Sequence, residues 1–356
     1  MHGLNRSTSL YLDIVRLLAA FCVLLGHVSF QNLSGGQLHF MAFAGKQAVD
    51  VFFVLSGFVI AYVCATREQN ARDYIISRAA RIYSVAIPAL ILTAVADAIG
   101  MHVNPDIYQG TTQDFLPGLI MRCVLFIGEQ WNAHRFPGCN GPYWSLGFEV
   151  WYYVAFGAFI FSPQKWRWLA AIAVLAFIGP KVALMFPTWL MGVAAYHICA
   201  AQKFSKSAGW MLYSVSLIIF IAYQLFPHSH LEEFKPLTMD WNRLRSIVED
   251  YFVCALFSAH LIGYSAISAH FAPYLERCAK PIRWLAGATF SLYLMHLPIM
   301  YLLAALNPFP ASSPLTLGLF LVMTPLACLA FAELSERRKE SWRLLITKLL
   351  RARKQP

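Results

Sequence analysis

Apolar residues dominate the chain in long runs, which shorter polar segments separate. Each run holds about 20 residues, enough for a helix to cross a hydrocarbon core of roughly 30 Å. Because a membrane span must satisfy its own backbone hydrogen bonds, the pattern predicts an all-α integral membrane protein. We expect about ten transmembrane helices, near residues 10–30, 48–66, 83–99, 143–162, 168–186, 187–201, 210–226, 248–270, 284–306 and 314–334.

Three segments need separate treatment. The run at 187–201 is short and predicts a tilted helix, and the apolar stretch 116–128 in the long third loop predicts a re-entrant or interfacial helix. The first run is not expected to be a cleaved signal peptide, because Arg16 interrupts it and Phe21 occupies a position where processing needs a small residue. We therefore expect it to stay in the mature protein.

Composition and charge agree with this fold class. The chain is 58% hydrophobic and 13% charged, against about 25% charged in soluble domains. With a cytoplasmic N-terminus, twenty of the 28 Lys and Arg residues fall on cytoplasmic segments and six on outer ones, which is the positive-inside bias. We expect both termini in the cytoplasm. The net charge of +10 then reflects orientation, and nucleic-acid binding is not expected.

The charge pattern also divides the chain. We expect a transmembrane domain over residues 1–338 and a basic cytoplasmic tail over 339–356, which would lie as an amphipathic segment near anionic lipid. No long hydrophilic stretch remains for a soluble domain. The oligomeric state is left open.

Cysteine spacing gives no sign of a metal site. The eight cysteines lie far apart, at positions 22, 64, 123, 139, 199, 254, 278 and 328. Most fall in apolar runs, where cysteine behaves as a small hydrophobic residue. Cys123 and Cys139 share the third loop on the predicted outer side, so a disulfide between them is left open.

Ionisable residues inside the first run are candidates for function. Such a group costs on the order of 3 kcal/mol within a membrane and by default marks a functional site. Arg16 and His27 are eleven residues apart, which places them on one helix face about 16 Å apart along the axis. Asp13 stands one turn before Arg16 and is expected to neutralise it. The structural alternative is a snorkelling arginine and a hydrogen-bonded core histidine.

Two further stretches add candidates near the two surfaces. Asp50 opens the second run on the outer side, and the Ser-Gly pair that follows it is typical of close helix packing. On the cytoplasmic side, Arg78 and Arg81 are three residues apart and share a helix face, a geometry suited to phosphate oxygens. An ordinary basic flank is the alternative for these arginines.

The fourth and ninth runs carry the remaining candidates. Trp144, Ser145 and Glu149 enter the fourth run from the outside, and Glu149 comes to a depth similar to that of His27. A buried carboxylate needs a partner, so we expect His27 first and a nearby arginine second. In the ninth run, Tyr293 and His296 are supporting candidates.

These stretches together resemble the acyltransferase-3 family of bacterial membrane proteins. The resemblance covers about residues 10–338 and is carried by five features. They are Arg16 with His27, "FFVLSGF", Arg78 with Arg81, "YWSLGFE" and "SLYLMHLPI". Family members are O-acyltransferases of surface and secreted carbohydrates in the bacterial inner membrane. The chain is most similar to stand-alone members, without a fused extracytoplasmic hydrolase-like domain.

The resemblance implies an acyl-CoA donor, most often acetyl-CoA, and a carbohydrate or glycolipid acceptor on the outer side. It assigns Arg16, Arg78 and Arg81 to the donor and His27 to the role of catalytic base. Histidine suits this role because its pKa lies near neutrality. Glu149 would orient or charge-balance the imidazole. We favour direct transfer to the sugar over a covalent acyl-enzyme.

The sequence departs from the family pattern at two places. Ser84 stands where a proline commonly follows Arg-Ile-Tyr, with Pro88 one turn later. In the degenerate closing Glu-x-Pro pattern, Glu340 aligns best, and Glu333 and Glu336 are rivals. No role is carried over to these glutamates.

Two other functions fit the composition. A proton-coupled transporter or flippase of lipid-linked sugars would also place Arg, His and Glu inside the membrane. The absence of an internal repeat and the grouping of arginines on one face argue against it. A glycosyltransferase or polymerase acting on lipid-linked sugars would be expected to carry a larger charged outer loop than residues 227–247.

Overall fold

The computed structural model describes residues 5–110, 115–201, 204–225 and 241–352. Over these ranges the secondary structure is helical, without a β-strand. Nine of the described helices are long and apolar enough to cross a membrane. The prediction of an all-α, multi-pass membrane protein is therefore confirmed, while the cytoplasmic placement of the termini stays a prediction.

The long helices alternate with short ones that connect them. In chain order the elements are α1 (Arg6–Val28), α2 (Gln31–Ser34), α3 (Met41–Thr66), α4 (Ala71–Val103), η1 (Pro105–Tyr108), α5 (Pro117–Val124), η2 (Gly141–Tyr143), α6 (Trp144–Phe161), α7 (Arg167–Ile178), α8 (Pro180–Ala200), α9 (Lys206–Leu225), α10 (Trp241–Arg277), α11 (Ala279–Ala286), α12 (Thr289–Leu306), α13 (Pro314–Leu334), η3 (Glu336–Arg338) and α14 (Lys339–Ala352).

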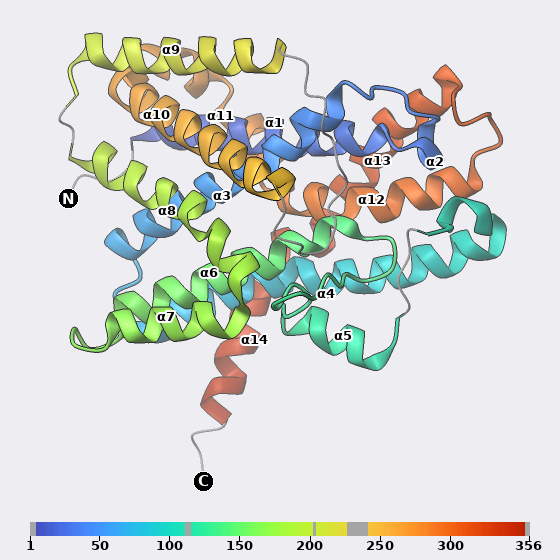
Figure 1. Cartoon of the computed structure of the whole chain (residues 1–356), viewed down its shortest axis with the longest axis horizontal. Helices are drawn as coiled ribbons and strands as arrows, with labels where there is room; N and C mark the ends of the chain where they lie inside the picture. Colours follow the sequence, from blue (N-terminus) through green and yellow to red (C-terminus); the bar gives the residue numbers. More distant parts are fainter. Residues whose placement is uncertain (1–4, 111–114, 202–203, 226–240, 353–356) are drawn as a thin grey trace.

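The bundle is organised around α12, the most deeply buried of the long helices. α12 packs against α1, α4 and α13, and α3 packs against α1 and α8. Figure 1 shows α9 and α10 along one edge of the bundle and α7 along the opposite edge. Residues of α1, α3, α4, α6 and α12 therefore meet inside the molecule, where a ligand can be enclosed.

The predicted boundary between the spans 168–186 and 187–201 is wrong. The chain breaks at Gly179, whose φ of 102° favours glycine, and α8 continues through Pro187. An internal proline removes only one backbone hydrogen bond, which neighbouring groups in a membrane bundle can compensate. α7 keeps 12 residues, about 18 Å of helix, which is too short to span alone.

Three other segments show how the predicted elements divide. The stretch 116–128 contains the short helix α5, and the tail predicted to be amphipathic forms α14. The predicted span 284–306 is two elements, because α11 ends at Ala286 and α12 begins at Thr289. Figure 1 shows α14 projecting from the body of the bundle beside α4.

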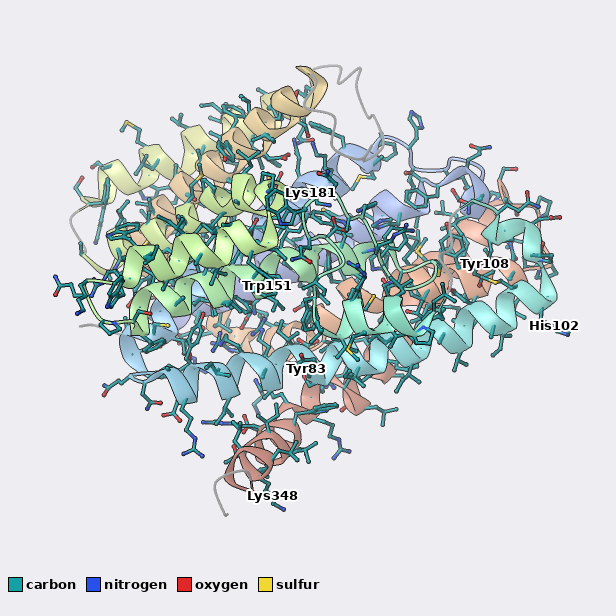
Figure 2. The ribbon with its side chains drawn as sticks, turned by 60° about the horizontal axis from the view of Figure 1, so that its bottom comes forward. Tyr83, His102, Tyr108, Trp151, Lys181 and Lys348 are labelled. Atoms are coloured by element: carbon teal, nitrogen blue, oxygen red, sulfur yellow. The ribbon has the colours of Figure 1, made fainter. Side chains whose placement is uncertain are left out.

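The long loop between α4 and α6 is held down by side chains from three helices. Tyr83 of α4 donates to the carbonyl of Val124 at 3.1 Å. Trp151 of α6 donates to the carbonyl of Phe126 at 2.9 Å. Lys181 of α8 donates to the carbonyl of Ala133 at 2.7 Å and pairs with buried Glu129. Figure 2 labels Tyr83, Trp151 and Lys181 on their helices. The loop is thus a fixed part of the fold.

Two glycines let α3 and α8 approach closely. A Cβ added at Gly57 would lie 2.0 Å from the carbonyl oxygen of Trp189, and one at Gly192 would lie 2.0 Å from that of Val54. Both obstacles are backbone atoms, which cannot move without shifting a helix. This explains the Ser-Gly pair in the second predicted span as a packing feature.

We expect Gly57→Ala to lower the thermal unfolding temperature of the detergent-solubilised protein. The added methyl group forces α3 and α8 apart, and such overpacking costs about 1–3 kcal/mol. Gly318→Ala on α13 is the matched control, because nothing lies within 4 Å of its added Cβ. Equal melting temperatures for the two variants would contradict this interpretation of the interface.

Cys123 and Cys139 do not form the disulfide that the sequence left open. Both are buried free thiols, and the Cys139 thiol donates to Oδ1 of Asp97 at 2.9 Å. Burial raises the pKa of Cys123 to about 12. Burial, and then the Asp97 carboxylate, raises the pKa of Cys139 well above its ordinary value. Both thiols therefore stay protonated at neutral pH.

Alkylation at pH 7 should distinguish these cysteines. Because the thiolate is the reactive form, we expect a maleimide to label exposed Cys278 and to spare Cys123 and Cys139 until the protein is denatured. Peptide mass spectrometry after native and denatured labelling measures this. A Cys123–Cys139 crosslink, or native labelling of Cys139, would refute the assignment.

Candidate active site

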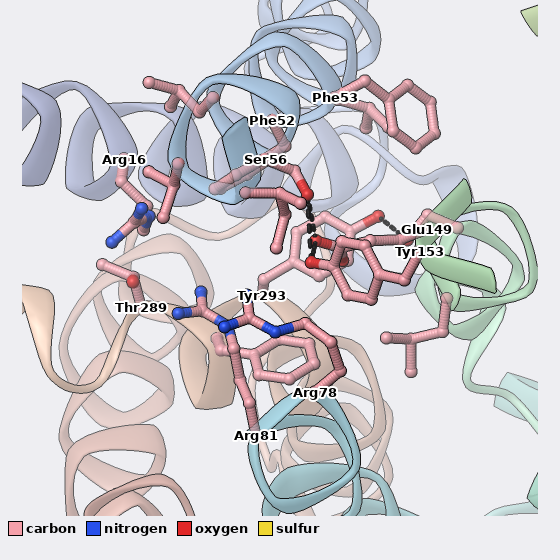
Figure 3. Close-up of a pocket in the computed structure, with 17 residues that line it drawn as sticks. Arg16, Phe52, Phe53, Ser56, Arg78, Arg81, Glu149, Tyr153, Thr289 and Tyr293 are labelled. Atoms are coloured by element: carbon pink, nitrogen blue, oxygen red, sulfur yellow. Dashed lines mark hydrogen bonds between the residues drawn. The ribbon is translucent and has the colours of Figure 1, made fainter. Parts of the chain in front are cut away.

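A cavity lies where α1, α3, α4, α6 and α12 meet. The space inside it and at its open mouth amounts to about 730 Å³. Its polar lining consists of Arg16, Ser56, Arg78, Arg81, Ser145, Glu149, Tyr153, Thr289 and Tyr293. These residues belong to five helices, and Figure 3 labels all of them except Ser145 around the cavity.

The three arginines predicted to act together do share this cavity. Arg78 and Arg81 come from one side of α4, as their spacing predicts, and Arg16 comes from α1. Figure 3 shows their guanidinium groups extending into the same part of the cavity. The arrangement concentrates positive charge beside apolar walls, where electrostatic attraction for an anion is strong.

The three arginines differ in the carboxylates that pair with their positive charge. Arg78 pairs with Glu68 at 2.7 Å. Arg16 lies 3.5 Å from Asp13, which confirms the predicted ion pair, and Asp13 also pairs with Arg283. Across the described ranges, the guanidinium group of Arg81 makes no hydrogen bond or ion pair, and only its backbone carbonyl accepts a hydrogen bond from a side chain, that of Ser84.

Two of the polar atoms around Arg78 also lack a partner. Arg78 Nε and Glu68 Oε2 are buried without a hydrogen bond among the described residues. Buried donors and acceptors in folded proteins are nearly always satisfied. Arg78 lines the cavity and Glu68 does not, so of these two atoms Arg78 Nε is the one that belongs to a cavity residue.

Glu149 lies beside the arginines and not against His27. Its Oε1 accepts from Ser56 at 2.7 Å and also from Tyr153, and Trp189 donates to Ser56 at 3.1 Å. The expectation that Glu149 meets His27 is wrong, and the alternative of a nearby arginine describes its surroundings better. Equal depth in two helices does not bring two side chains together, because each helix also has an orientation about its axis.

His27 instead meets His296. Nε2 of His296 lies 3.0 Å from Nδ1 of His27, with the ring centroids 4.9 Å apart. His27 is half-buried near the end of α1, and His296 is fully buried. Arg16 and His27 thus both turn toward α12, as the prediction of a shared face requires, but His27 does not line the arginine cavity.

Tyr293 connects the two regions along α12. It lines the cavity, its hydroxyl donates to Ser145 at 2.8 Å, and its ring centroid lies 6.4 Å from that of His296. The predicted supporting residues Ser145 and Tyr293 therefore line the arginine cavity, and His296 contacts both Tyr293 and His27.

Two other predicted candidates lie away from the cavity lining. Asp50 is buried in α3, where it interacts electrostatically with Asp250 and Lys46, which form an ion pair at 3.2 Å. Trp144 packs its ring against Phe53 and Phe148. The prediction that Asp50 reaches the site is not supported by this placement.

The sequence analysis gave no role to Glu336, which the structure places at the site. Its Oε2 accepts from the backbone N–H groups of Phe290 and Ser291 at 3.1 and 3.0 Å, so it caps α12. It also interacts electrostatically with Arg81 and Arg16. Glu340, the better aligned candidate, is exposed on α14. Glu336 differs from Glu340 in its burial and in its hydrogen bonds to the N-terminus of α12, which the degenerate motif did not reveal.

No metal site is evident among the described side chains, because no group of three or more His, Cys, Asp or Glu residues is arranged to hold an ion. The fold and the cavity define a multi-pass membrane protein with a polar, cationic site enclosed between its helices.

Comparison with known families identifies the class further. The family model described as "Acyltransferase domain" matches residues 9–333, and the chain belongs to this acyltransferase-3 family. The resemblance read from the five motifs is therefore confirmed. No solved structure gives a significant match.

Curated relatives are similar at low identity. The peptidoglycan O-acetyltransferase OatA of Listeria monocytogenes is 24% identical over 82% of this chain and 49% of its own length. The exopolysaccharide production protein ExoZ of Rhizobium meliloti is 29% identical over 35% and 37%, respectively. The O-acetyl transferase of Shigella phage Sf6 is 27% identical over 58% and 66%. The chain thus spans about half or less of the first two of these relatives.

We expect Glu336→Gln to lower both the melting temperature and the activity. The substitution keeps the side-chain length but removes a charge at the α12 N-terminus, where an anion stabilises a helix by about 0.3–2 kcal/mol. Glu340→Gln is the matched control on the exposed neighbouring segment. Thermal unfolding in detergent measures the difference, and an equal effect at both positions would argue against a special role for Glu336.

Proposed function

We propose that the protein is a membrane O-acyltransferase that moves an acyl group, most often acetyl, from acyl-CoA to a hydroxyl of a carbohydrate or glycolipid. The observation that carries the proposal is the cavity of three arginines, in which the Arg81 guanidinium makes no hydrogen bond or ion pair with the described residues. Family membership and relatives named as O-acetyltransferases support the reaction class over a transporter.

The residues present suit an acyl-CoA donor. Its phosphates are anionic, and guanidinium groups bind phosphate oxygens through paired, charge-assisted hydrogen bonds. Arg16, Arg78 and Arg81 would hold them. Arg16 and His27 are eleven residues apart on α1, about 16 Å along the axis, and the extended arm of CoA has a comparable length. The donor bound at the arginines would thus present its thioester toward His27.

His27 would act as general base. A sugar hydroxyl is a weak nucleophile at neutral pH, and a positioned base speeds such a step by about 10²–10⁴-fold. The hydroxyl proton passes to His27, the oxygen attacks the thioester carbonyl, and the thiolate of CoA leaves. We favour this direct route, with Tyr293 and Ser145 lining the path that the arm follows.

The proposal also assigns the donor and the acceptor to opposite sides of the membrane. Under the predicted orientation the arginines lie toward the cytoplasm, where acyl-CoA is made, and His27 lies toward the outer leaflet, where surface carbohydrates are presented. The protein would work in the bacterial inner membrane. ExoZ is named for exopolysaccharide production and OatA for peptidoglycan, so the acceptor class is a surface or secreted glycan.

Transfer of radiolabel from acetyl-CoA to glycan in membranes tests this function. We expect Arg81→Ala to raise the KM for acetyl-CoA by about 10–100-fold, because a hydrogen bond to a charged group contributes about 1.5–3 kcal/mol. We expect His27→Ala to lower kcat by about 10²–10⁴-fold. Arg72→Ala is the control, since Arg72 lies exposed on the same helix as Arg81.

Different results would refute different parts of the proposal. No transfer by the wild-type protein would exclude acetyl-CoA as donor. An unchanged KM for acetyl-CoA in Arg81→Ala would show that Arg81 does not bind the donor. Full activity of His27→Ala would show that His27 is not the general base.

A further inference from the structure

The two histidines that meet near the end of α1 are each also bound to a backbone carbonyl. Nδ1 of His27 lies 2.9 Å from the carbonyl oxygen of Val23, one turn earlier on α1. Nδ1 of His296 lies 2.9 Å from the carbonyl oxygen of Leu292, one turn earlier on α12. The third contact joins Nε2 of His296 to Nδ1 of His27 at 3.0 Å.

These contacts fix where the protons lie. A carbonyl oxygen can only accept a hydrogen bond, so both Nδ1 atoms must carry a hydrogen. A neutral imidazole carries one N–H, so Nε2 of His296 holds a lone pair. The Nδ1–H of His27 therefore makes a bifurcated hydrogen bond. Its two acceptors are the carbonyl of Val23 and the lone pair on Nε2 of His296. The same reasoning leaves Nε2 of His27 unprotonated.

We propose that His296 is a positioning residue for His27. It keeps the hydrogen of His27 on Nδ1 and holds the ring, so that Nε2 is the atom that takes the proton of the acceptor hydroxyl. This inference rests on the proposed function, in which His27 is the base. His296 then occupies the place that a carboxylate holds in a catalytic triad, while Glu149 serves the arginine cavity.

The proton balance of the step follows from this arrangement. As the hydroxyl proton moves to Nε2 of His27, the ring becomes a cation with a hydrogen on each nitrogen. The Nδ1–H stays bonded to Val23 and His296, which stabilise the cation without taking the proton. Nε2 then returns the proton to the CoA thiolate, so His27 is restored and His296 is unchanged.

The local packing supports a fixed geometry. His296 is fully buried, and its bond to Leu292 ties the ring to the backbone of the most buried helix. The ring of Phe30 meets the His27 ring edge-on at 5.1 Å between centroids. A ring held on both sides cannot flip to exchange its nitrogens without breaking these contacts.

Two substitutions at position 296 separate positioning from simple packing. In His296→Gln the side-chain oxygen reaches the place of Nε2 and can accept from His27, whereas the bond to Leu292 is lost. In His296→Asn the amide is one bond shorter, so it can donate to Leu292 but cannot reach His27. Each variant keeps one of the two contacts that the wild-type ring makes.

In the acetyl-CoA transfer assay we expect His296→Gln to keep kcat within about tenfold of wild type. We expect His296→Asn to lower kcat by about 10²–10⁴-fold, the contribution of a positioned general base, because His27 loses its orienting partner. The KM for acetyl-CoA should stay unchanged in both. If His296→Asn were as active as His296→Gln or more active, the proposal would be overturned. Such a result would show that activity depends on the contact with Leu292 and not on the contact with His27.

A second measurement does not depend on activity. Nitrogen-15 NMR of histidine-labelled wild-type protein, with the His27 signal assigned from the spectrum of His27→Ala, reports which ring nitrogen carries hydrogen. We expect hydrogen on Nδ1 and a lone pair on Nε2 of His27. Hydrogen on Nε2 would overturn the inference whatever the substrate, whereas a wild-type protein inactive with acetyl-CoA would overturn only the proposed donor.

Discussion

The rest of the structure depends on one constraint: the positive charges of arginines inside the helix bundle must be neutralised by nearby carboxylates. A charge removed from water and left unpaired costs several kcal/mol, and intramembrane charges are correspondingly rare. Three arginines meet at one cavity, and carboxylates from separate segments surround them. These carboxylates are Asp13, Glu68, Glu149 and Glu336. Electrostatic attraction to Arg81 thus acts from Asp13 on α1, Glu149 on α6 and Glu336 on η3.

The compensation is incomplete in a way that suits a binding site. Arg78 and Glu68 each keep one buried polar atom without a hydrogen bond, and the Arg81 guanidinium makes no hydrogen bond or ion pair with the described residues. A fully neutralised cluster would have little affinity for an anion. The network of Glu149, Tyr153 and Ser56 sits on the other wall of the same cavity, so the site combines cationic and hydrogen-bonding sides.

The sequence predicted the features that depend on a single helix. Hydrophobic run length predicted most of the spans, and spacing of three residues predicted the shared side of Arg78 and Arg81 and the pairing of Asp13 with Arg16. These properties follow from helical periodicity, which is local in sequence. Local reasoning did less well at Gly179 and Pro187, where the break depends on a backbone angle that the apolar pattern does not specify.

Contacts between helices were beyond the sequence alone. Several helices carry polar residues at similar depth, and depth does not decide which faces which, so Glu149 was assigned to His27 and His296 was underestimated. Glu336 was hidden for a related reason. Its role comes from the N-terminus of a helix about 45 residues earlier in the chain, a relation that only the folded structure supplies.

The position of Glu336 ties the end of the chain to the cavity. It lies between α13 and α14, bonds the first turn of α12 and interacts electrostatically with Arg81. α14 begins three residues later and packs along α4, the helix that carries Arg78 and Arg81. The amphipathic tail is therefore connected to the arginine site through Glu336 and through α4. A shift of α14 along α4 would therefore displace the wall that holds the guanidinium groups.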